Sequence, residues 1–357
     1  MTHKADNTTA SPATRPLRVA VVGAGYFAQF HLDAWERLAA AGLVELVAIV
    51  DADADRLGQA CQSYRPAASF TSMPLMLAAI SVDLLDIATP PATHHELVSL
   101  AAAHGIDCIV QKPLAPDWQQ AQAIVDCAAQ AGIRLVVHEN FRRMPWFREM
   151  RRCLDAGMLG TPHSMSVRLR PGDGQGASAY LARQAYFQQM PRFLVHETAI
   201  HFVDSFRYLL GEVVAVTARL RRLNPAIAGE DAGYILLEFA GGATALIDGN
   251  RLNDHSAVNP RLTMGEQWLE GSAGVMRLDG DGVLHFKPHG AAETVHDYQW
   301  ENRGFGGDCV FALQQQVVMD IAQQRASINT GEEYLRNIEI EEAIYDSHEE
   351  GRTIDLS

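Results

Sequence analysis

Gly23, Gly25 and Ala28 have the residue types and the spacing of a turn that holds phosphate groups. They follow residues 19–22, an apolar run that predicts a strand buried on both faces, and a helix is predicted over residues 26–41. Gly23 permits a sharp turn, Gly25 lets the backbone approach a pyrophosphate, and Ala28 allows the helix to pack close to the strand. Because the N-terminus of a helix attracts anions, this pattern predicts a dinucleotide site.

An acidic residue follows the second predicted strand. Asp51 comes directly after residues 44–50, where its carboxylate can accept hydrogen bonds from the ribose hydroxyls of an adenosine. The alternative is that Asp51 only caps the next helix. No arginine is adjacent to hold a 2′-phosphate, so NAD is favoured over NADP, although Arg56 lies nearby.

Lys112 is the first candidate for the chemical step. It follows an apolar strand predicted over residues 106–110 and lies between Gln111 and Pro113. Hydride transfer from a carbinol requires removal of the alcohol proton, and a lysine at this position can bind the substrate oxygen or act as the base. The flanking strand and proline argue against an ordinary solvated lysine.

Glu197 and His201 form a second candidate pair. They are four residues apart on a helix predicted over residues 197–210, so both project from one face. Histidine titrates near neutrality and suits an alcohol proton, while Glu197 can orient the imidazole or bind a substrate hydroxyl. His201 could instead be a buried core histidine. His196 could contact substrate, but it lies about 140° from His201 around the helix, so we expect no metal site.

The predicted elements explain how these residues are brought together. Up to residue 145, strands alternate with helices, which predicts a doubly wound parallel sheet whose functional loops follow the strand ends. Residues 146–357 predict an α+β domain with a largely antiparallel sheet, whose last helices could pack back on the first domain. The further residues expected to contact the cofactor are Tyr26, Phe27, Thr89, Pro90, His94, Gln111 and Asn140. For His94 an ordinary helix-start role is the alternative, and simple helix packing is the alternative for Tyr26 and Phe27.

Composition limits the class of protein. The formal net charge of −14 argues against nucleic acid or an anionic membrane as partner. Five scattered cysteines favour free thiols in a reducing compartment, and residues 1–16 are typical of a disordered tail, not a signal peptide. We therefore expect a cytoplasmic protein.

Taken in order, the motifs resemble those of the glucose–fructose oxidoreductase / inositol dehydrogenase / MocA family, from about residue 17 to the C-terminus. The resemblance implies a Rossmann domain joined to an open antiparallel sheet, association into a homodimer or homotetramer through that sheet, and oxidation or reduction of a hydroxyl on a sugar or polyol. It places Lys112 beside the nicotinamide, and Gln111 replaces the family's usual glutamate. The motifs are Gly23-x-Gly25, Thr89-Pro90-Pro91 with His94, Gln111-Lys112-Pro113, Glu197 with His201, and Glu342-Ala343-Ile344-Tyr345-Asp346-Ser347.

These observations predict an NAD-dependent oxidoreductase acting on a sugar, polyol or sugar acid, in which Lys112 and His201 handle the proton and Glu197 supports them. Arg142 and Arg168 could reach a polyhydroxyl or carboxylate substrate, although solvated or structural roles are equally open. Two alternatives remain. One is an NAD-dependent glycosidase of the same family, and the other is a non-catalytic nucleotide or sugar sensor.

Overall fold

The computed structural model describes residues 15–356. The predicted tail at residues 1–16 falls outside this part of the chain, except for Arg15 and Pro16. The Arg15 guanidinium donates hydrogen bonds to both carboxylate oxygens of Asp83, at 2.7 Å each. Within the described residues, no helix is long and apolar enough to cross a membrane.

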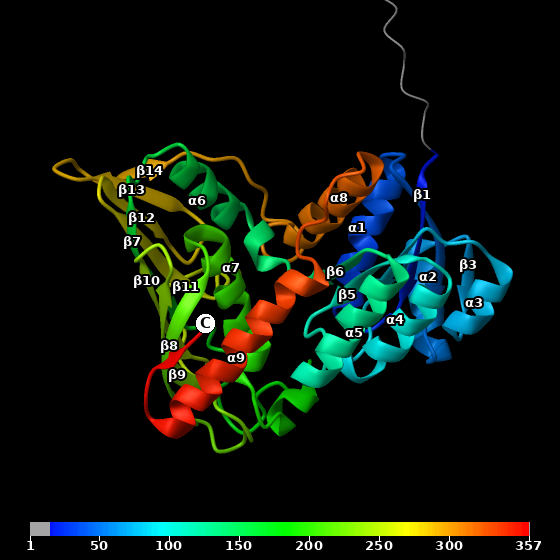
Figure 1. Cartoon of the computed structure of the whole chain (residues 1–357), viewed down its shortest axis with the longest axis horizontal. Coiled ribbons are helices and arrows are strands. Elements are labelled where there is room, and N and C mark those ends of the chain that lie inside the picture. The colour runs from blue at the N-terminus through cyan, green and yellow to red at the C-terminus, as the bar shows by residue number, and fades with distance from the viewer. Residues whose placement is uncertain (1–14, 357) are drawn as a thin grey trace, which may run out of the picture.

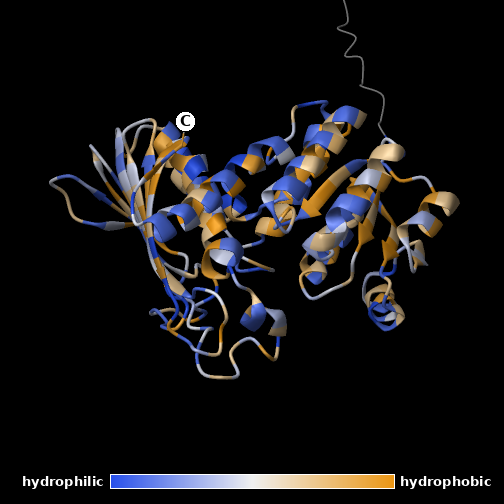
Figure 2. Ribbon diagram, turned by 60° about the horizontal axis from the view of Figure 1, so that its bottom comes forward, coloured by the Kyte–Doolittle hydropathy of each residue, from blue (hydrophilic) through white to orange (hydrophobic). Residues whose placement is uncertain are grey.

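The first half of the chain forms a six-stranded parallel sheet with the order β3-β2-β1-β4-β5-β6. Apart from the edge strand β3, its strands are apolar and largely buried, as a sheet covered by helices on both faces requires, and Figure 2 shows strands in hydrophobic colours between helices. The strands are β1 (Leu17–Val22), β2 (Val44–Val50), β3 (Ala68–Phe70), β4 (Leu84–Ile87), β5 (Asp107–Gln111) and β6 (Leu135–His138). The helices between them are α1 (Ala28–Ala40), α2 (Ala54–Tyr64), α3 (Met73–Ala79), α4 (His94–Ala103) and α5 (Trp118–Ala131).

The second half forms a nine-stranded sheet with the order β14-β13-β12-β11-β7-β10-β9-β8-β15. Neighbouring strands are antiparallel except β7 and β10, which are parallel. The strands are β7 (Pro162–Leu169), β8 (Val213–Arg221), β9 (Ala232–Phe239), β10 (Thr244–Asn250), β11 (Gly265–Gly271), β12 (Gly274–Leu278), β13 (Leu284–Pro288), β14 (Thr294–His296) and β15 (Ile354–Asp355). Burial alternates along β9 and β10, so one face of this sheet packs on the core and the other faces outward.

Four α-helices follow β6 in the described part of the chain. They are α6 (Pro145–Asp155), α7 (Ile200–Leu210), α8 (Cys309–Ala322) and α9 (Gly331–Glu350). The last two return to the first sheet: Leu313 and Val317 of α8 share a core with Trp35, and Tyr334 of α9 shares one with Leu135. In Figure 1, α9 runs between the two sheets. The first sheet and the second are therefore held together by buried apolar contacts.

The helix predicted over residues 197–210 differs from the one observed. A π-helical segment covers Leu194–Ala199, and the α-helix begins only at Ile200. The wider π-helical turn replaces the α-helical spacing from which Glu197 and His201 are expected to share a face. Such segments are frequently found at functional sites.

Candidate active site

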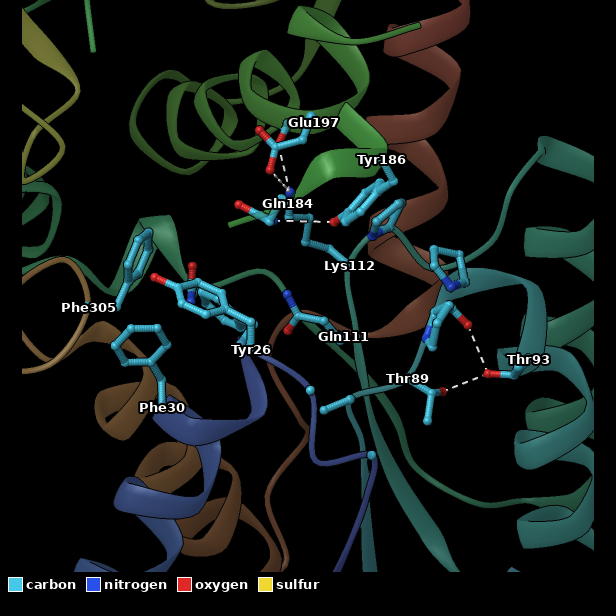
Figure 3. Close-up of a pocket in the computed structure, with 18 of the residues that line it drawn as sticks. Tyr26, Phe30, Thr89, Thr93, Gln111, Lys112, Gln184, Tyr186, Glu197 and Phe305 are labelled. Carbon is cyan, nitrogen blue, oxygen red and sulfur yellow. Dashed lines mark hydrogen bonds and ion pairs between the residues drawn. The ribbon is translucent and has the colours of Figure 1, made fainter. Parts of the chain in front are cut away.

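A cavity of about 1170 Å³ lies between the two halves of the chain. The first sheet contributes the loops that follow β1, β2, β4 and β5, and the second half contributes the π-helical segment and the short 3-10 helix Ala185–Gln189, which contains Tyr186. Figure 3 shows Lys112 and Gln111 rising from one side toward Glu197 and Tyr186 on the other. The carboxyl ends of the parallel strands therefore face the second domain across one space.

The glycine turn has the geometry that a diphosphate needs. Gly23 has a φ of +103°, and a Cβ built on it would lie 2.7 Å from the carbonyl oxygen of Ala88. Gly25 lines the cavity, and a Cβ on it would meet no atom within 4 Å beyond its chain neighbours. The first glycine is required by the turn itself, whereas the second leaves open space on the cavity side.

Asp51 is fixed to this turn. One carboxylate oxygen, Oδ2, accepts a hydrogen bond from the Ala24 amide at 2.7 Å, and Oδ1 accepts one from the Asp53 amide at 2.8 Å. The cap of α2 is Asp53, which accepts hydrogen bonds from the amides of Asp55 and Arg56. Asp51 therefore does not cap that helix and faces the cavity, with Arg56 Nη2 3.3 Å from Oδ1.

Lys112 spans the cavity to the second domain. Its Nζ donates a hydrogen bond to the backbone carbonyl of Glu197 at 2.6 Å and lies 3.4 Å from Oε1 of the same residue. The side chain is only 10% exposed. The ammonium is therefore oriented by two oxygens of the π-helical segment.

The Glu197 carboxylate is the centre of a buried charge network. Arg251 Nη1 donates to its Oε2 at 2.8 Å, and Arg251 in turn contacts both carboxylate oxygens of Asp173, at 3.1 and 2.8 Å. Burial acts to raise the pKa of Glu197, but the charges of Lys112 and Arg251 outweigh it and hold the pKa well below its usual range. Glu197 is thus an anion that cannot supply a proton near neutral pH.

His201 is oriented by a different carboxylate from the one expected. Its Nδ1 lies 2.6 and 2.7 Å from the two oxygens of Glu139, and its ring stacks on Phe141 with centroids 3.9 Å apart. Among the described residues none hydrogen-bonds Nε2, and the imidazole lines the cavity. The prediction that Glu197 could orient this ring is therefore wrong, because Glu139 holds it.

Glu139 directly follows β6. The next residue is Asn140, a predicted cofactor residue that lines the cavity. The signal that could have found Glu139 is the same strand-end rule that selected Asn140. Arg251, Asp173 and Tyr186 were also missed. Asp173 and Arg251 lie outside the helices and strands, and Tyr186 lies in a 3-10 helix of five residues, so none of them belongs to a segment long enough to carry a periodic signal.

Most of the other predicted contact residues do line the cavity: Tyr26, Phe27, Thr89, Pro90, Gln111 and His196. The side chain of Gln111 is also held by α1, because its Oε1 lies 3.1 Å from Nε2 of His31. The other nitrogen of His31 lies 2.8 Å from Asp86, a carboxylate that is fully buried. The side chain of Gln111 is therefore held by a buried pair beneath the cavity floor.

Three predicted residues do not line the cavity. His94 is fully buried, with its two nitrogens 2.9 Å from the carbonyls of Leu114 and Thr89, so its role is to fix that loop. Arg142 forms a bidentate ion pair with Asp204. Arg168 lies on the outward face of β7, with 57% of its side chain exposed. The predictions that the two arginines contact substrate are wrong because the first is committed to a buried carboxylate and the second points away.

Comparison with known proteins agrees with this geometry. Residues 17–139 match the family described as "Oxidoreductase family, NAD-binding Rossmann fold", and residues 147–270 match "GFO/IDH/MocA C-terminal domain". D-apiose dehydrogenase from Paraburkholderia graminis is 32% identical over 346 residues, covering 94% of this chain and 89% of the relative. Inositol 2-dehydrogenase 4 from Saccharopolyspora erythraea is 30% identical over 240 residues, 66% of this chain and 67% of the relative.

A solved structure of an oxidoreductase is similar to this protein over almost the whole chain. An oxidoreductase from Agrobacterium radiobacter, in complex with NAD+, L-tartaric acid and magnesium, is 30% identical with a TM-score of 0.86. The match covers 96% of this chain and 98% of that one. With family matches in both halves and a glycine turn and strand-end acid in place, this protein belongs to the glucose–fructose oxidoreductase / inositol dehydrogenase / MocA family of NAD-binding oxidoreductases.

Proposed function

We propose that this protein is an NAD-dependent dehydrogenase that transfers a hydride between a hydroxyl of a sugar, polyol or sugar acid and the nicotinamide. The observation that carries the proposal is the convergence of Lys112 and His201 on one cavity with the glycine turn and Asp51. The relatives named D-apiose dehydrogenase and inositol 2-dehydrogenase support the substrate class.

The residues present fit NAD. The open space beside Gly25 admits a pyrophosphate, and the buried Asp51 carboxylate suits two ribose hydroxyls better than a 2′-phosphate, which it would repel. When bound, NAD accepts the hydride from the carbinol carbon. Arg56, which contacts Asp51, is the residue that could moderate this preference.

The protein's own groups handle the proton. Lys112, an ammonium paired with Glu197, hydrogen-bonds the substrate oxygen and stabilises negative charge as it develops there. His201 presents Nε2 to the cavity and accepts the hydroxyl proton, and the Glu139 carboxylate at Nδ1 stabilises the resulting imidazolium. Glu197 fixes the position of Lys112, and the cavity-lining His196 and Gln111 contact the substrate and the cofactor ribose.

The test is a substrate panel followed by the absorbance of the reduced cofactor. We expect NAD reduction with at least one member of a panel of D-apiose and other aldoses, inositols and sugar acids including L-tartrate, and slower reduction of NADP. Lys112→Ala serves as the inactive control. Sugar hydrolysis without net NADH would support the glycosidase alternative. NADH binding with no turnover of any compound would support a sensor.

We further propose that residues 17–145 bind the cofactor, that residues 146–357 bind the substrate, and that two or four copies associate through the outward face of the nine-stranded sheet. That face carries Val214, Tyr234, Leu236 and Leu246, which are 37–49% exposed. Light scattering on wild type and a Tyr234→Lys variant tests the association, because a lysine there should lower the oligomeric mass.

The five free cysteines support a reducing, cytoplasmic location.

A further inference from the structure

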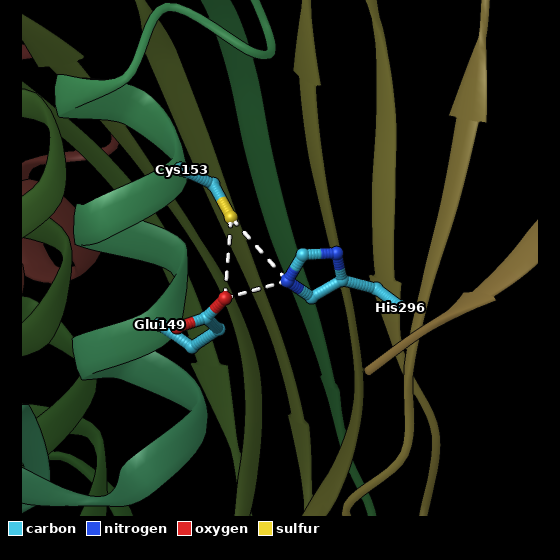
Figure 4. A group of neighbouring side chains, drawn as sticks. All are labelled: Glu149, Cys153 and His296. Atoms are coloured by element: carbon cyan, nitrogen blue, oxygen red, sulfur yellow. Dashed lines mark hydrogen bonds and ion pairs between the residues drawn. The ribbon is translucent and has the colours of Figure 1, made fainter. Parts of the chain in front are cut away.

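Three potential metal ligands meet between α6 and β14, outside the cavity. Glu149 and Cys153 are four residues apart on α6 and project from the same face of the helix. His296 comes from β14, the edge strand of the nine-stranded sheet. Figure 4 shows the thiol, the carboxylate and the imidazole directed at a common point. None of the three lines the cavity described above.

The distances suit a tetrahedral ion. Cys153 Sγ lies 3.6 Å from His296 Nε2 and 3.6 Å from Glu149 Oε1. With the usual bond lengths of zinc to sulfur, nitrogen and oxygen, tetrahedral angles place each of these ligand pairs about 3.6 Å apart. Two of the three ligand–ligand distances therefore already match those of a zinc site.

The third ligand–ligand distance, between His296 and Glu149, is shorter. His296 Nε2 and Glu149 Oε1 are 2.5 Å apart, the length of a hydrogen bond. Binding of an ion requires this pair to open by about 0.9 Å and replaces one shared proton with a metal between them. The two side chains are partly exposed, at 13% and 12%, so solvent reaches the pair that must separate.

The ligand chemistry selects the kind of ion. A set of one sulfur, one nitrogen and one oxygen suits zinc and similar transition metals, whereas calcium and magnesium take oxygen ligands. Cys153 is fully buried, whereas the side chains of Glu149 and His296 are partly accessible to solvent. Three protein ligands leave the fourth position for a water molecule.

We propose that Glu149, Cys153 and His296 form a zinc-binding site that is separate from the dehydrogenase cavity. An ion bound there joins α6 to β14. Among residues 15–356, that strand pairs with β13 alone, through three residues. The site would therefore hold an edge strand in place rather than take part in catalysis.

One neighbouring group opposes the binding of a cation. Arg152 Nη2 and Nε donate to the two oxygens of Glu149, at 2.6 and 2.8 Å. Its side chain is 60% exposed and can swing into solvent, but its charge repels an ion at Oε1. Removing Arg152 should therefore strengthen metal binding, a result that a simple hydrogen-bonded cluster does not predict.

The experiment uses the full-length protein after treatment with a chelator. Co²⁺ is added as the probe, and the near-ultraviolet charge-transfer band of a thiolate-bound cobalt ion is recorded. Zn²⁺ then competes for the same site. We expect one Co²⁺ per chain, displacement by Zn²⁺, and tighter binding in Arg152→Ala.

Variants of the ligands and a matched control complete the test. Cys153→Ala should abolish the band, while Cys127→Ala, which changes a cysteine on α5, should keep it. His296→Ala, at the edge of the sheet, should weaken Co²⁺ binding by more than the roughly 10- to 100-fold that loss of an outer partner costs. NADH binding in each variant reports whether it is folded. Absence of the band in the wild type, or its persistence in Cys153→Ala, would overturn the proposal.

Discussion

The Nζ of Lys112 donates a hydrogen bond to the backbone carbonyl of Glu197 at 2.6 Å. This contact joins the end of β5 in the first sheet to the π-helical segment of the second domain. A backbone carbonyl oxygen has two lone pairs, so it can accept this hydrogen bond in addition to a backbone one. The lysine proposed to act on the substrate is thus positioned by a domain that contributes no strand to the six-stranded parallel sheet.

Replacing Lys112 with alanine should reduce kcat/KM by about 10²- to 10⁴-fold, because the ammonium that stabilises the substrate oxygen is lost. NADH affinity, measured by fluorescence titration, should change much less. Lys287→Ala is the matched control, since Lys287 is exposed on β13 outside the cavity. Unaltered turnover in the Lys112 variant would contradict the assignment.

Glu139→Gln tests whether Glu139 acts through His201. The amide keeps a hydrogen bond to Nδ1 but cannot stabilise an imidazolium, so kcat should fall by about 10²-fold or more. The double variant with His201→Ala should be no slower than His201→Ala alone, because groups that act as a unit are not additive. Additive losses in steady-state kinetics would show that the two residues act independently.

The two glycines of the turn should respond differently to alanine. Gly25→Ala should leave the thermal unfolding temperature unchanged and weaken NADH binding at least about tenfold, because the new methyl group enters the cavity without touching the protein. Gly23→Ala should lower the free energy of unfolding by more than about 1 kcal/mol, since its φ is positive and its Cβ meets Ala88. Calorimetry and NADH titration separate the two effects, and wild-type NADH affinity in Gly25→Ala would refute the proposed pyrophosphate position.

Glu197 should make stability depend on pH. Lys112 and Arg251 hold its folded-state pKa below the unfolded value despite burial, so its contribution is fully present above about pH 4.3 and is lost as pH falls through the folded-state pKa. In that acidic range, Glu197→Gln should flatten the slope of unfolding free energy against pH by up to about 1.4 kcal/mol per unit. Urea unfolding at several pH values measures the slope. Glu36→Gln, on the exposed face of α1, is the control, and equal slopes in the wild type and the Glu197 variant would contradict the network.

Local patterns were enough to predict the parallel strands, the glycine turn and the strand-end residues. Each depends on neighbours in the chain: an apolar run before Gly23, an acid directly after β2, a lysine directly after β5. The rule that parallel strands carry their functional loops at one edge then brings Gly25, Asp51 and Lys112 to the same cavity without knowledge of side-chain packing.

Pairings between distant residues could not be predicted in this way. Glu139 meets His201 across 62 residues, and Cys153 meets His296 across 143. Nothing in the local sequence shows that Arg142 is paired, but in the structure its guanidinium donates a hydrogen bond to Asp204. Local sequence determined the elements and their ends because backbone preference and burial act over a few residues. Only the tertiary structure decided which charges are paired, because that depends on how the two domains and the helices between them pack.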